Sequence, residues 1–164
     1  MNNVNIYILT GSIQTGKTTK LLQWSTHRND VYGILTPIIN DRRMFMDIAS
    51  KEQFMMEAVA DEIDVLAIGR YTFSAKAFKK ATQILIHASL IQKEWLVIDE
   101  IGPLEVNKQG FYDCIKTILE KNNTQKIILV VRKNLLTEVL SIFNLKEDSY
   151  QIIEISSYNS ILKY

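Results

Sequence analysis

The sequence contains few of the residues that mark several protein classes. It has one cysteine, Cys114, in 164 residues, which excludes an intrachain disulfide and fits a reducing compartment. Two prolines and six glycines leave no room for a Pro- or Gly-rich linker, and no segment is repetitive. No apolar run approaches the roughly 20 residues of a membrane span, and no basic segment precedes a long apolar core. We therefore expect a cytoplasmic protein without a membrane segment.

The sequence also has almost no net charge. Its 19 Lys and Arg residues nearly balance its 18 Asp and Glu residues, for a net charge of +1. The sequence therefore has no surplus of positive charge that would indicate a nucleic-acid-binding surface or binding to an anionic membrane. The hydrophobic content of 47% and the length are those of an ordinary globular chain, which predicts a single domain over residues 1–164. Protein partners are not predictable from these properties.

The sequence does contain a complete phosphate-binding loop pattern. Residues 11–18 read Gly-Ser-Ile-Gln-Thr-Gly-Lys-Thr and match G-x-x-x-x-G-K-[ST]. An apolar run at residues 4–9 predicts a strand before the loop, and residues 18–24 have the spacing of a short helix. The backbone N–H groups of such a loop and the positive end of its helix bind phosphate oxygens. We predict that ATP or another nucleoside triphosphate binds to Gly11, Ser12, Ile13, Gln14, Thr15, Gly16, Lys17, Thr18 and Thr19.

Two acidic residues supply the second half of the predicted site. Lys17 would contact the β- and γ-phosphates, and the Thr18 hydroxyl would bind Mg²⁺. Residues 95–98 read as a buried strand that ends at Asp99 and Glu100. Because ligands gather at the carboxyl ends of parallel strands, Asp99 is expected to join the magnesium shell. Glu100 is the predicted catalytic carboxylate, which orients a water for in-line attack.

Apolar runs alternate with helical patterns along the chain, which predicts an α/β domain with a mostly parallel sheet. Residues 31–39, 44–49 and 53–57 read as a small antiparallel meander inserted after the first helix. Residues 65–68 and 152–155 are further strand candidates, residues 126–132 are the predicted central strand, and a short helix is possible from about residue 158. Helices are expected after Ser74, over residues 111–121 and over residues 135–143. Arg132, at the end of its strand, is a candidate catalytic cation near the γ-phosphate.

The stretch Asp99-Glu100-Ile101-Gly102-Pro103-Leu104-Glu105 is more specific. It resembles the D-E-I-G-x-M-E-L signature of the small nucleoside-triphosphatases first known from thermophiles, a family that includes the cancer-related nucleoside-triphosphatase. Residues 33–37, 42–45 and 69–71 resemble the family segments G-F-x-T, R-x-G-F and G-x-Y in the same order. The resemblance implies a three-layer P-loop NTPase fold with a RecA-like sheet, and nucleotide hydrolysis.

The sequence departs from the family pattern at three places. Gln14 and Thr15 replace an internal glycine step of the loop, Met44 stands at a family glycine, and Leu104 replaces a methionine. The outer glycines and Lys17 are intact, so nucleotide binding is still expected. Arg42 and Glu105 match charged positions of the family, and Arg70 lies within the segment that resembles G-x-Y. The sequence assigns no role to these three residues. Arg42 is preferred over Arg43 as a residue near the nucleotide.

Three functions share this set of residues. The leading hypothesis is a Mg²⁺-dependent nucleoside-triphosphatase that cleaves the β–γ bond with slow turnover. A nucleotide-dependent switch or adaptor would use the same residues, and the sequence does not separate it from a slow hydrolase. A small-molecule kinase needs an acceptor pocket and usually an arginine-bearing lid, and the scattered Lys and Arg residues indicate no such lid.

Overall fold

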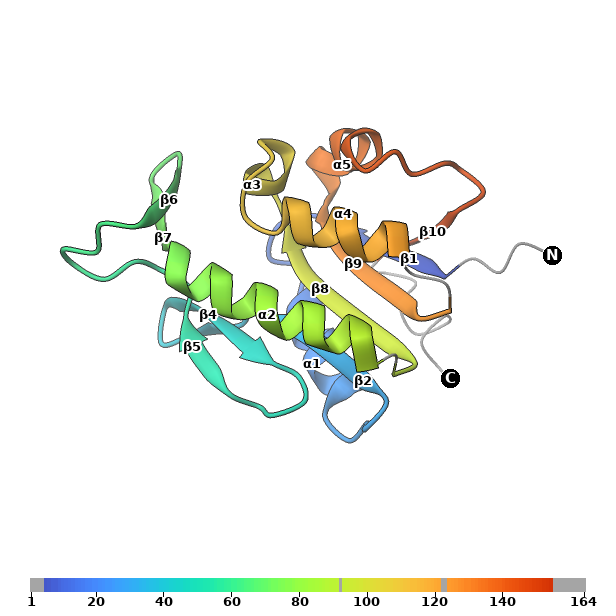
Figure 1. The fold of residues 1–164 in the computed structure, drawn as a ribbon, viewed down its shortest axis with the longest axis horizontal. Coiled ribbons are helices and arrows are strands. Elements are labelled where there is room, and N and C mark those ends of the chain that lie inside the picture. Colours follow the sequence, from blue (N-terminus) through green and yellow to red (C-terminus); the bar gives the residue numbers. More distant parts are fainter. Residues whose placement is uncertain (1–4, 92, 122–123, 155–164) are drawn as a thin grey trace.

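A mostly parallel sheet forms the centre of the protein. The computed structural model describes residues 5–91, 93–121 and 124–154 (Figure 1). The strands of its main sheet are β1 (Ile6–Gly11), β2 (Val31–Leu35), β3 (Ile38–Ile39), β4 (Arg42–Asp47), β5 (Gln53–Met55), β8 (Trp95–Ile101), β9 (Lys126–Arg132) and β10 (Tyr150–Glu154). Their spatial order is β10-β1-β9-β8-β2-β4-β3, and β5 pairs with β4 beside this path. The prediction of a mixed α/β fold with a mainly parallel sheet is confirmed.

The order of the parallel strands brings the predicted site residues to one edge. The pairs β10–β1, β1–β9, β9–β8 and β8–β2 are all parallel, so the carboxyl ends of these strands lie together. Strand β9 lies between β1 and β8, in agreement with the prediction of a central strand over residues 126–132. Gly11, where the phosphate loop begins, is paired in register with Arg132. The chain therefore assembles the loop, the acidic pair and Arg132 at the same end of the sheet.

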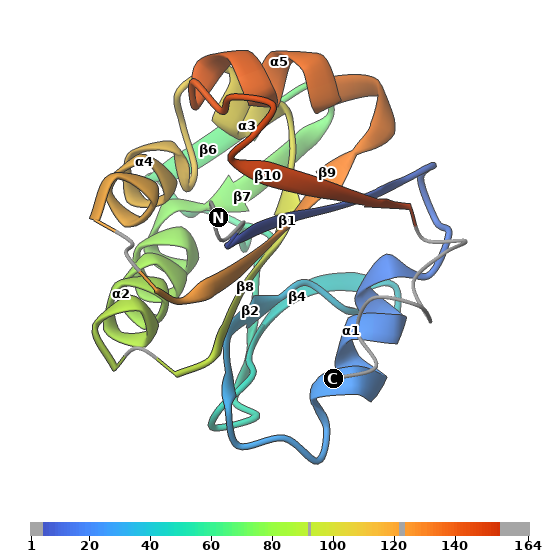
Figure 2. The ribbon, with the colours of Figure 1, turned by 90° about the vertical axis from the view of Figure 1, so that its right-hand side faces the viewer.

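Helices cover both faces of this sheet. They are α1 (Lys17–Ser25), α2 (Ala75–Ile91), α3 (Pro103–Val106), α4 (Tyr112–Lys121), the 3₁₀ helix η1 (Lys133–Leu135) and α5 (Leu136–Ile142). Helix α1 lies on one side of the sheet, and α2, α4 and α5 lie on the other (Figure 2). Adjacent strand residues point to opposite faces, so Ile8 packs in the α2 and α4 cluster and Leu9 packs with Leu21 of α1. The result is the three-layer arrangement that the family resemblance implied.

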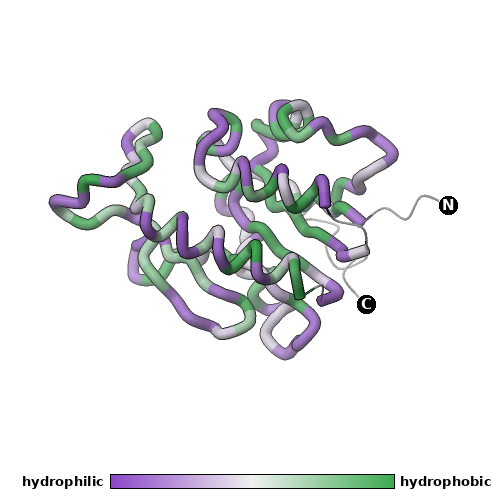
Figure 3. Tube along the Cα trace, viewed as in Figure 1, coloured by the Kyte–Doolittle hydropathy of each residue, from purple (hydrophilic) through white to green (hydrophobic). Residues whose placement is uncertain are grey.

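Hydrophobic patterning agrees with these layers. The hydrophobic colour runs along the central strands in Figure 3, whereas α2 alternates between hydrophobic and hydrophilic positions. Helix α2 begins where expected, because Ser74 Oγ accepts a 3.1 Å hydrogen bond from the Ala77 N–H. None of the helices in the described ranges combines the length and the apolar composition that a membrane span requires. The possible helix from about residue 158 lies outside the described residues.

The antiparallel insertion is present with one change. Strands β2, β4 and β5 pair antiparallel, and the β3–β4 hairpin turns at Asn40 and Asp41, whose φ values are 50° and 60°. Positive φ at both residues is typical of the type I′ turn that joins short hairpins. The predicted continuous strand over residues 31–39 is instead divided at Thr36 and Pro37, because proline cannot donate to a strand ladder.

A second, two-stranded sheet stands apart from the main one. Strands β6 (Val65–Ile68) and β7 (Tyr71–Ser74) pair antiparallel and turn through Gly69 and Arg70. Strand β6 agrees with the prediction, whereas β7 has no counterpart among the predicted strands. This β6–β7 hairpin projects beside the N-terminal end of α2 in Figure 1. It places the residues around Tyr71 near the end of β8.

Candidate nucleotide-binding and catalytic site

The phosphate loop lies between β1 and α1, as the pattern predicts. Gly16 has φ of 79° at the start of α1, a left-handed conformation that glycine adopts without strain. Gln14 also has positive φ, at 60°, although it carries a side chain. The Thr15 hydroxyl donates a 2.8 Å hydrogen bond to the Ser12 carbonyl and fixes the turn. Residues 13–19 line a cleft of about 610 Å³, which we call the phosphate cleft. It is large enough for a small ligand such as a nucleotide.

Lys17 bends back across this loop. Its Nζ donates to the Ser12 carbonyl at 2.7 Å and to the Gly11 carbonyl at 3.2 Å. Burial lowers the pKa of Lys17, while the Asp99 charge opposes that shift. Gly11 and Ser12 therefore orient the lysine through their carbonyl oxygens, and Ile13 through Thr19 form the wall of the cleft.

Asp99 is joined to the loop by a direct hydrogen bond. The Thr18 hydroxyl donates to Asp99 Oδ2 at 2.8 Å, across 81 residues of sequence. Thr36 adds two more bonds to the same oxygen, from its backbone N–H and its hydroxyl, each 3.0 Å long. Asp99 is only 1% exposed, and burial, followed by the neighbouring Glu100 charge, raises its pKa. A cation beside this carboxylate would therefore stabilise its charged form.

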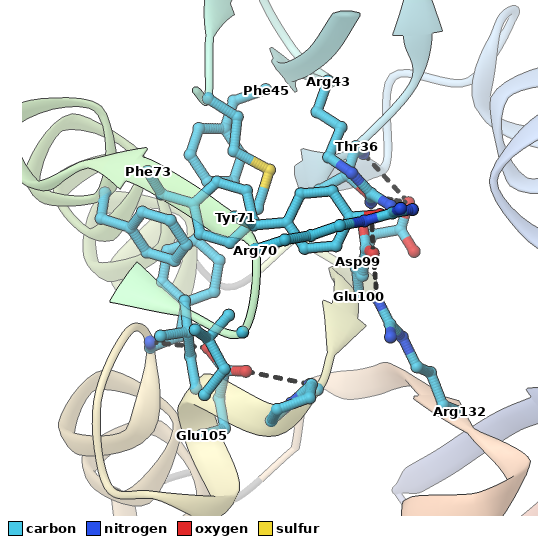
Figure 4. A pocket seen from close by; sticks show the side chains of 18 residues that line it. Thr36, Arg43, Phe45, Arg70, Tyr71, Phe73, Asp99, Glu100, Glu105 and Arg132 are labelled. Atoms are coloured by element: carbon cyan, nitrogen blue, oxygen red, sulfur yellow. Dashed lines mark hydrogen bonds and ion pairs between the residues drawn. The ribbon is translucent and has the colours of Figure 1, made fainter. Parts of the chain in front are cut away.

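Glu100 accepts ion pairs from two arginines. Arg43 Nη1 lies 2.7 Å and Arg132 Nη2 lies 2.8 Å from the same oxygen, Glu100 Oε1 (Figure 4). An irregularity in the β8–β9 register between Ile98 and Ile101 accompanies a φ of 60° at Glu100. In a regular strand Asp99 and Glu100 would point to opposite faces. The bulge lets both carboxylates line the cleft.

Two residues in this cluster were not assigned from the sequence. Arg43 lines the cleft, whereas Arg42 is exposed and its Nη1 contacts the Met55 sulfur at 3.6 Å. The geometry thus reverses the preference for Arg42. The sequence places Thr36 only within a family-like segment, although a threonine directly after an apolar run is a signal for a residue at the end of a strand.

Arg70 and Glu105 lie outside the phosphate cleft. The Arg70 guanidinium donates to the Tyr71 hydroxyl at 3.0 Å on the β6–β7 hairpin. Glu105 is buried, and its two oxygens accept the N–H groups of Gly102 at 2.9 Å and Phe111 at 3.0 Å. Burial raises the pKa of Glu105 to about 7. These bonds give Glu105 a structural role in shaping the loop after β8.

Comparison with known proteins gives matches over most of the chain. A family model described as NTPase matches residues 6–161. The nucleoside-triphosphatase THEP1 of Saccharolobus solfataricus is 31% identical over 141 residues, which cover 80% of this chain and 78% of that protein. The chain belongs to this NTPase family. It is therefore a nucleoside-triphosphatase enzyme, and the resemblance seen in residues 99–105 is confirmed.

Two solved structures of the NTPase family share its fold. The crystal structure of THEP1 from the hyperthermophile Aquifex aeolicus matches with a TM-score of 0.74 and 19% identity, and covers 96% of this chain and 94% of that one. The solution structure of a human cancer-related nucleoside triphosphatase matches with a TM-score of 0.67 and 19% identity, over 94% and 90% of the two chains. These matches confirm the P-loop NTPase fold.

Proposed function

We propose that the protein cleaves the β–γ bond of ATP, GTP or a related triphosphate by Mg²⁺-dependent attack of water, with slow turnover. The observation that supports this most is the meeting of Thr18, Asp99 and Glu100 on the cleft formed by the phosphate loop. Loop amides and Lys17 would bind the β- and γ-phosphates. We further propose that residues 1–164 act as one domain.

The donor set at Thr18 and Asp99 fits Mg²⁺. Mg²⁺ prefers oxygen ligands and keeps several waters, so one hydroxyl and one buried carboxylate beside the phosphates are sufficient. Within the described residues, no group of three or more His, Cys, Asp and Glu side chains could hold a metal, which fits a site completed by phosphate and water. When bound, the ion would neutralise charge on the β- and γ-phosphates.

Glu100 would act on water, and its place in the lining of the cleft with Lys17 and Asp99 supports this role. The water oxygen bonds to the γ-phosphorus as the bridging bond to the β-phosphate breaks, and the water proton passes towards Glu100. Arg132 and Arg43 would move some of their hydrogen bonding from Glu100 to the γ-phosphate oxygens. Cations at that position stabilise the spread negative charge of the transition state.

Phosphate release with two variants tests this assignment. The purified protein is incubated with ATP, GTP, CTP or UTP, with and without Mg²⁺, and free phosphate is followed. Glu100→Gln should keep nucleotide affinity, measured by calorimetry, but lower release by at least about a hundredfold. Lys17→Ala should lose tight binding. Glu120→Gln, at an exposed position on α4, serves as the matched control and should behave as the wild type. Unchanged release by Glu100→Gln would remove Glu100 from the mechanism.

A further inference from the structure

A second cavity lies on the other side of Glu100 from the phosphate loop. Its volume is about 250 Å³. Figure 4 shows the side chains that line it. The phosphate cleft and this cavity share a wall, made of Thr36, Arg43, Asp99, Glu100 and Arg132. A molecule in the second cavity would therefore face the same carboxylate that faces the nucleotide. We call this space the aromatic cavity, after the residues described next.

Aromatic rings from several elements form the aromatic cavity. Phe45 of β4, Phe73 of β7, Phe78 of α2 and Phe111 before α4 are all buried, and Tyr71 stands at the rim. Phe78 meets Phe45 edge-to-face and also contacts Phe111, with ring centroids 5.0 Å apart in each pair. Because each ring is held by its neighbours, the wall is preorganised for a flat apolar group.

The rim of the aromatic cavity is polar on the side nearest Glu100. The guanidinium carbons of Arg43 and Arg70 each lie 5.1 Å from the centre of the Tyr71 ring. Arg43 forms an ion pair with Glu100, whereas Arg70 forms no ion pair within the described part of the chain. Arg70 thus offers hydrogen-bond donors to a polar substituent. The volume lies below the roughly 300–1,000 Å³ of drug-sized sites, which limits a ligand to one small ring system.

We propose that the aromatic cavity binds a small aromatic alcohol that accepts the γ-phosphoryl group. This inference rests on the proposed function for the nucleotide and for Glu100. The hydroxyl oxygen bonds to the γ-phosphorus, the bond from that phosphorus to the β-phosphate bridging oxygen breaks, and the hydroxyl proton passes to Glu100. The products are the nucleoside diphosphate and a phosphate monoester. Water would take the place of the alcohol when the cavity is empty, and the result would be the slow hydrolysis proposed above.

Two methionines allow binding to be measured without catalysis. Met56 lines the aromatic cavity and Met46 lines the phosphate cleft, while Met44 and Met55 line neither. Protein labelled with ¹³C at the methionine methyls is titrated with benzyl alcohol or 3-pyridinemethanol and followed by NMR. We expect a saturable ring-current shift at Met56, at least fivefold larger than that at Met46. Ethanol, which has no ring, should not produce it. Absence of the Met56 shift with both alcohols overturns the proposal.

Phosphoryl transfer is measured with γ-labelled ATP, Mg²⁺ and the same alcohols. We expect at least tenfold more phosphate monoester from an aromatic alcohol than from ethanol. Ile68→Trp, which fills the aromatic cavity from the β6–β7 hairpin, should lower ester formation at least tenfold. Its phosphate release in the absence of alcohol should change less than twofold. Ile63→Trp is the matched control, because Ile63 is 96% exposed and outside the cavity.

The possible failures are distinguishable. Phosphate release with a Met56 shift but no ester from either alcohol overturns the acceptor role and leaves the hydrolase intact. A protein that releases no phosphate under any condition, yet shows the Met56 shift, contradicts the proposed function and not the binding site. Glu100→Gln should lose both ester and phosphate while it keeps the Met56 shift. Equal ester formation by the Ile68→Trp and Ile63→Trp variants would place the alcohol elsewhere and overturn the assignment.

Discussion

The Thr18 hydroxyl donates a 2.8 Å hydrogen bond to the carboxylate of Asp99, and so joins the phosphate loop to the end of β8. The acceptor oxygen also receives both hydrogen bonds of Thr36, which holds Asp99 in one orientation although the carboxylate is buried. Burial, followed by the neighbouring Glu100 charge, raises the pKa of Asp99, so the protein disfavours the charged form of this carboxylate. Under the proposed function, a bound Mg²⁺ would stabilise the charged form of Asp99.

If Asp99 contributes to a magnesium site as proposed, Asp99→Asn should lower the affinity for Mg²⁺ more than it lowers the stability of the fold. The amide keeps the size of the side chain and an acceptor oxygen for Thr18 but removes the charge. We expect the apparent Mg²⁺ affinity, measured by titrating phosphate release, to fall by about 10–100-fold. Thermal unfolding should show no large loss, because the variant no longer buries a charge. An unchanged Mg²⁺ titration would exclude Asp99 from the magnesium shell.

Arg43 and Arg42 form a matched pair of neighbours in β4. Arg43→Ala removes a guanidinium 2.7 Å from Glu100, whereas Arg42→Ala removes an exposed side chain of the same kind. We expect kcat for phosphate release to fall at least about tenfold in the Arg43 variant and less than about twofold in the Arg42 variant. Arg43→Lys should restore little activity, because lysine cannot reproduce the planar fork. Similar losses in both alanine variants would contradict the role of Arg43.

The choice between these arginines shows where sequence reasoning stops. The loop pattern, the strand before Asp99 and the helix periods are local signals, and each identified its element. Arg42 and Arg43 are adjacent in a strand, so their side chains point to opposite faces. Which face meets Glu100 depends on the register of β4 against β2 and β3, and a shift by one residue would exchange the two arginines. No local pattern reports that register.

The aromatic cavity was hidden from the sequence for the same reason. Phe45, Phe73, Phe78 and Phe111 each read as an ordinary apolar residue of a strand or helix, and only the folded chain brings them together. Strand β7 was missed because it is short and leads directly into α2, whose N-cap signal at Ser74 was the stronger pattern. Arg70 could therefore not be placed at a cavity rim in advance.

Glu105 should make stability depend on pH between about 4.5 and 7. Its pKa rises from 4.5 to about 7 on folding, so the folded state holds the proton over that range and the unfolded state does not. The stabilisation is complete below the unfolded pKa and is lost as the pH rises through the folded pKa. At roughly 1.4 kcal/mol per pKa unit, the loss is on the order of 3 kcal/mol.

Urea unfolding at pH 5, 6, 7 and 8 measures this contribution against Glu105→Gln, which does not titrate. The free energy of unfolding of the wild type should fall more between pH 5 and pH 8 than that of the variant, by up to about 3 kcal/mol. Because the other titrating groups are the same in both proteins, their contributions cancel in the difference between the two pH profiles. The variant itself should be less stable at pH 5, because its amide nitrogen meets a backbone N–H at Gly102 or Phe111. Parallel pH profiles would show that Glu105 is not the group responsible.

Replacement of Gln14 with glycine should destabilise the protein less than the same replacement at a glutamine within a helix. Its φ of 60° is a conformation in which a side chain costs about 1–2 kcal/mol and glycine costs almost nothing. The family's loop pattern has an internal glycine where this chain has Gln14. Gln14→Gly should therefore leave triphosphate affinity within about threefold of the wild type. Relief of strain offsets the greater freedom of glycine in the unfolded chain. We therefore expect an unfolding free energy that is unchanged or slightly higher.

Gln23→Gly is the control for this substitution, since Gln23 is exposed within α1. Glycine there should destabilise the protein by about 1 kcal/mol, because it loses helix propensity without relieving any strain. Urea unfolding of the two variants should thus differ by at least about 1 kcal/mol in favour of Gln14→Gly. If both variants lost the same stability, the loop would not hold Gln14 in the left-handed conformation. Its departure from the family glycine would then cost nothing in folding.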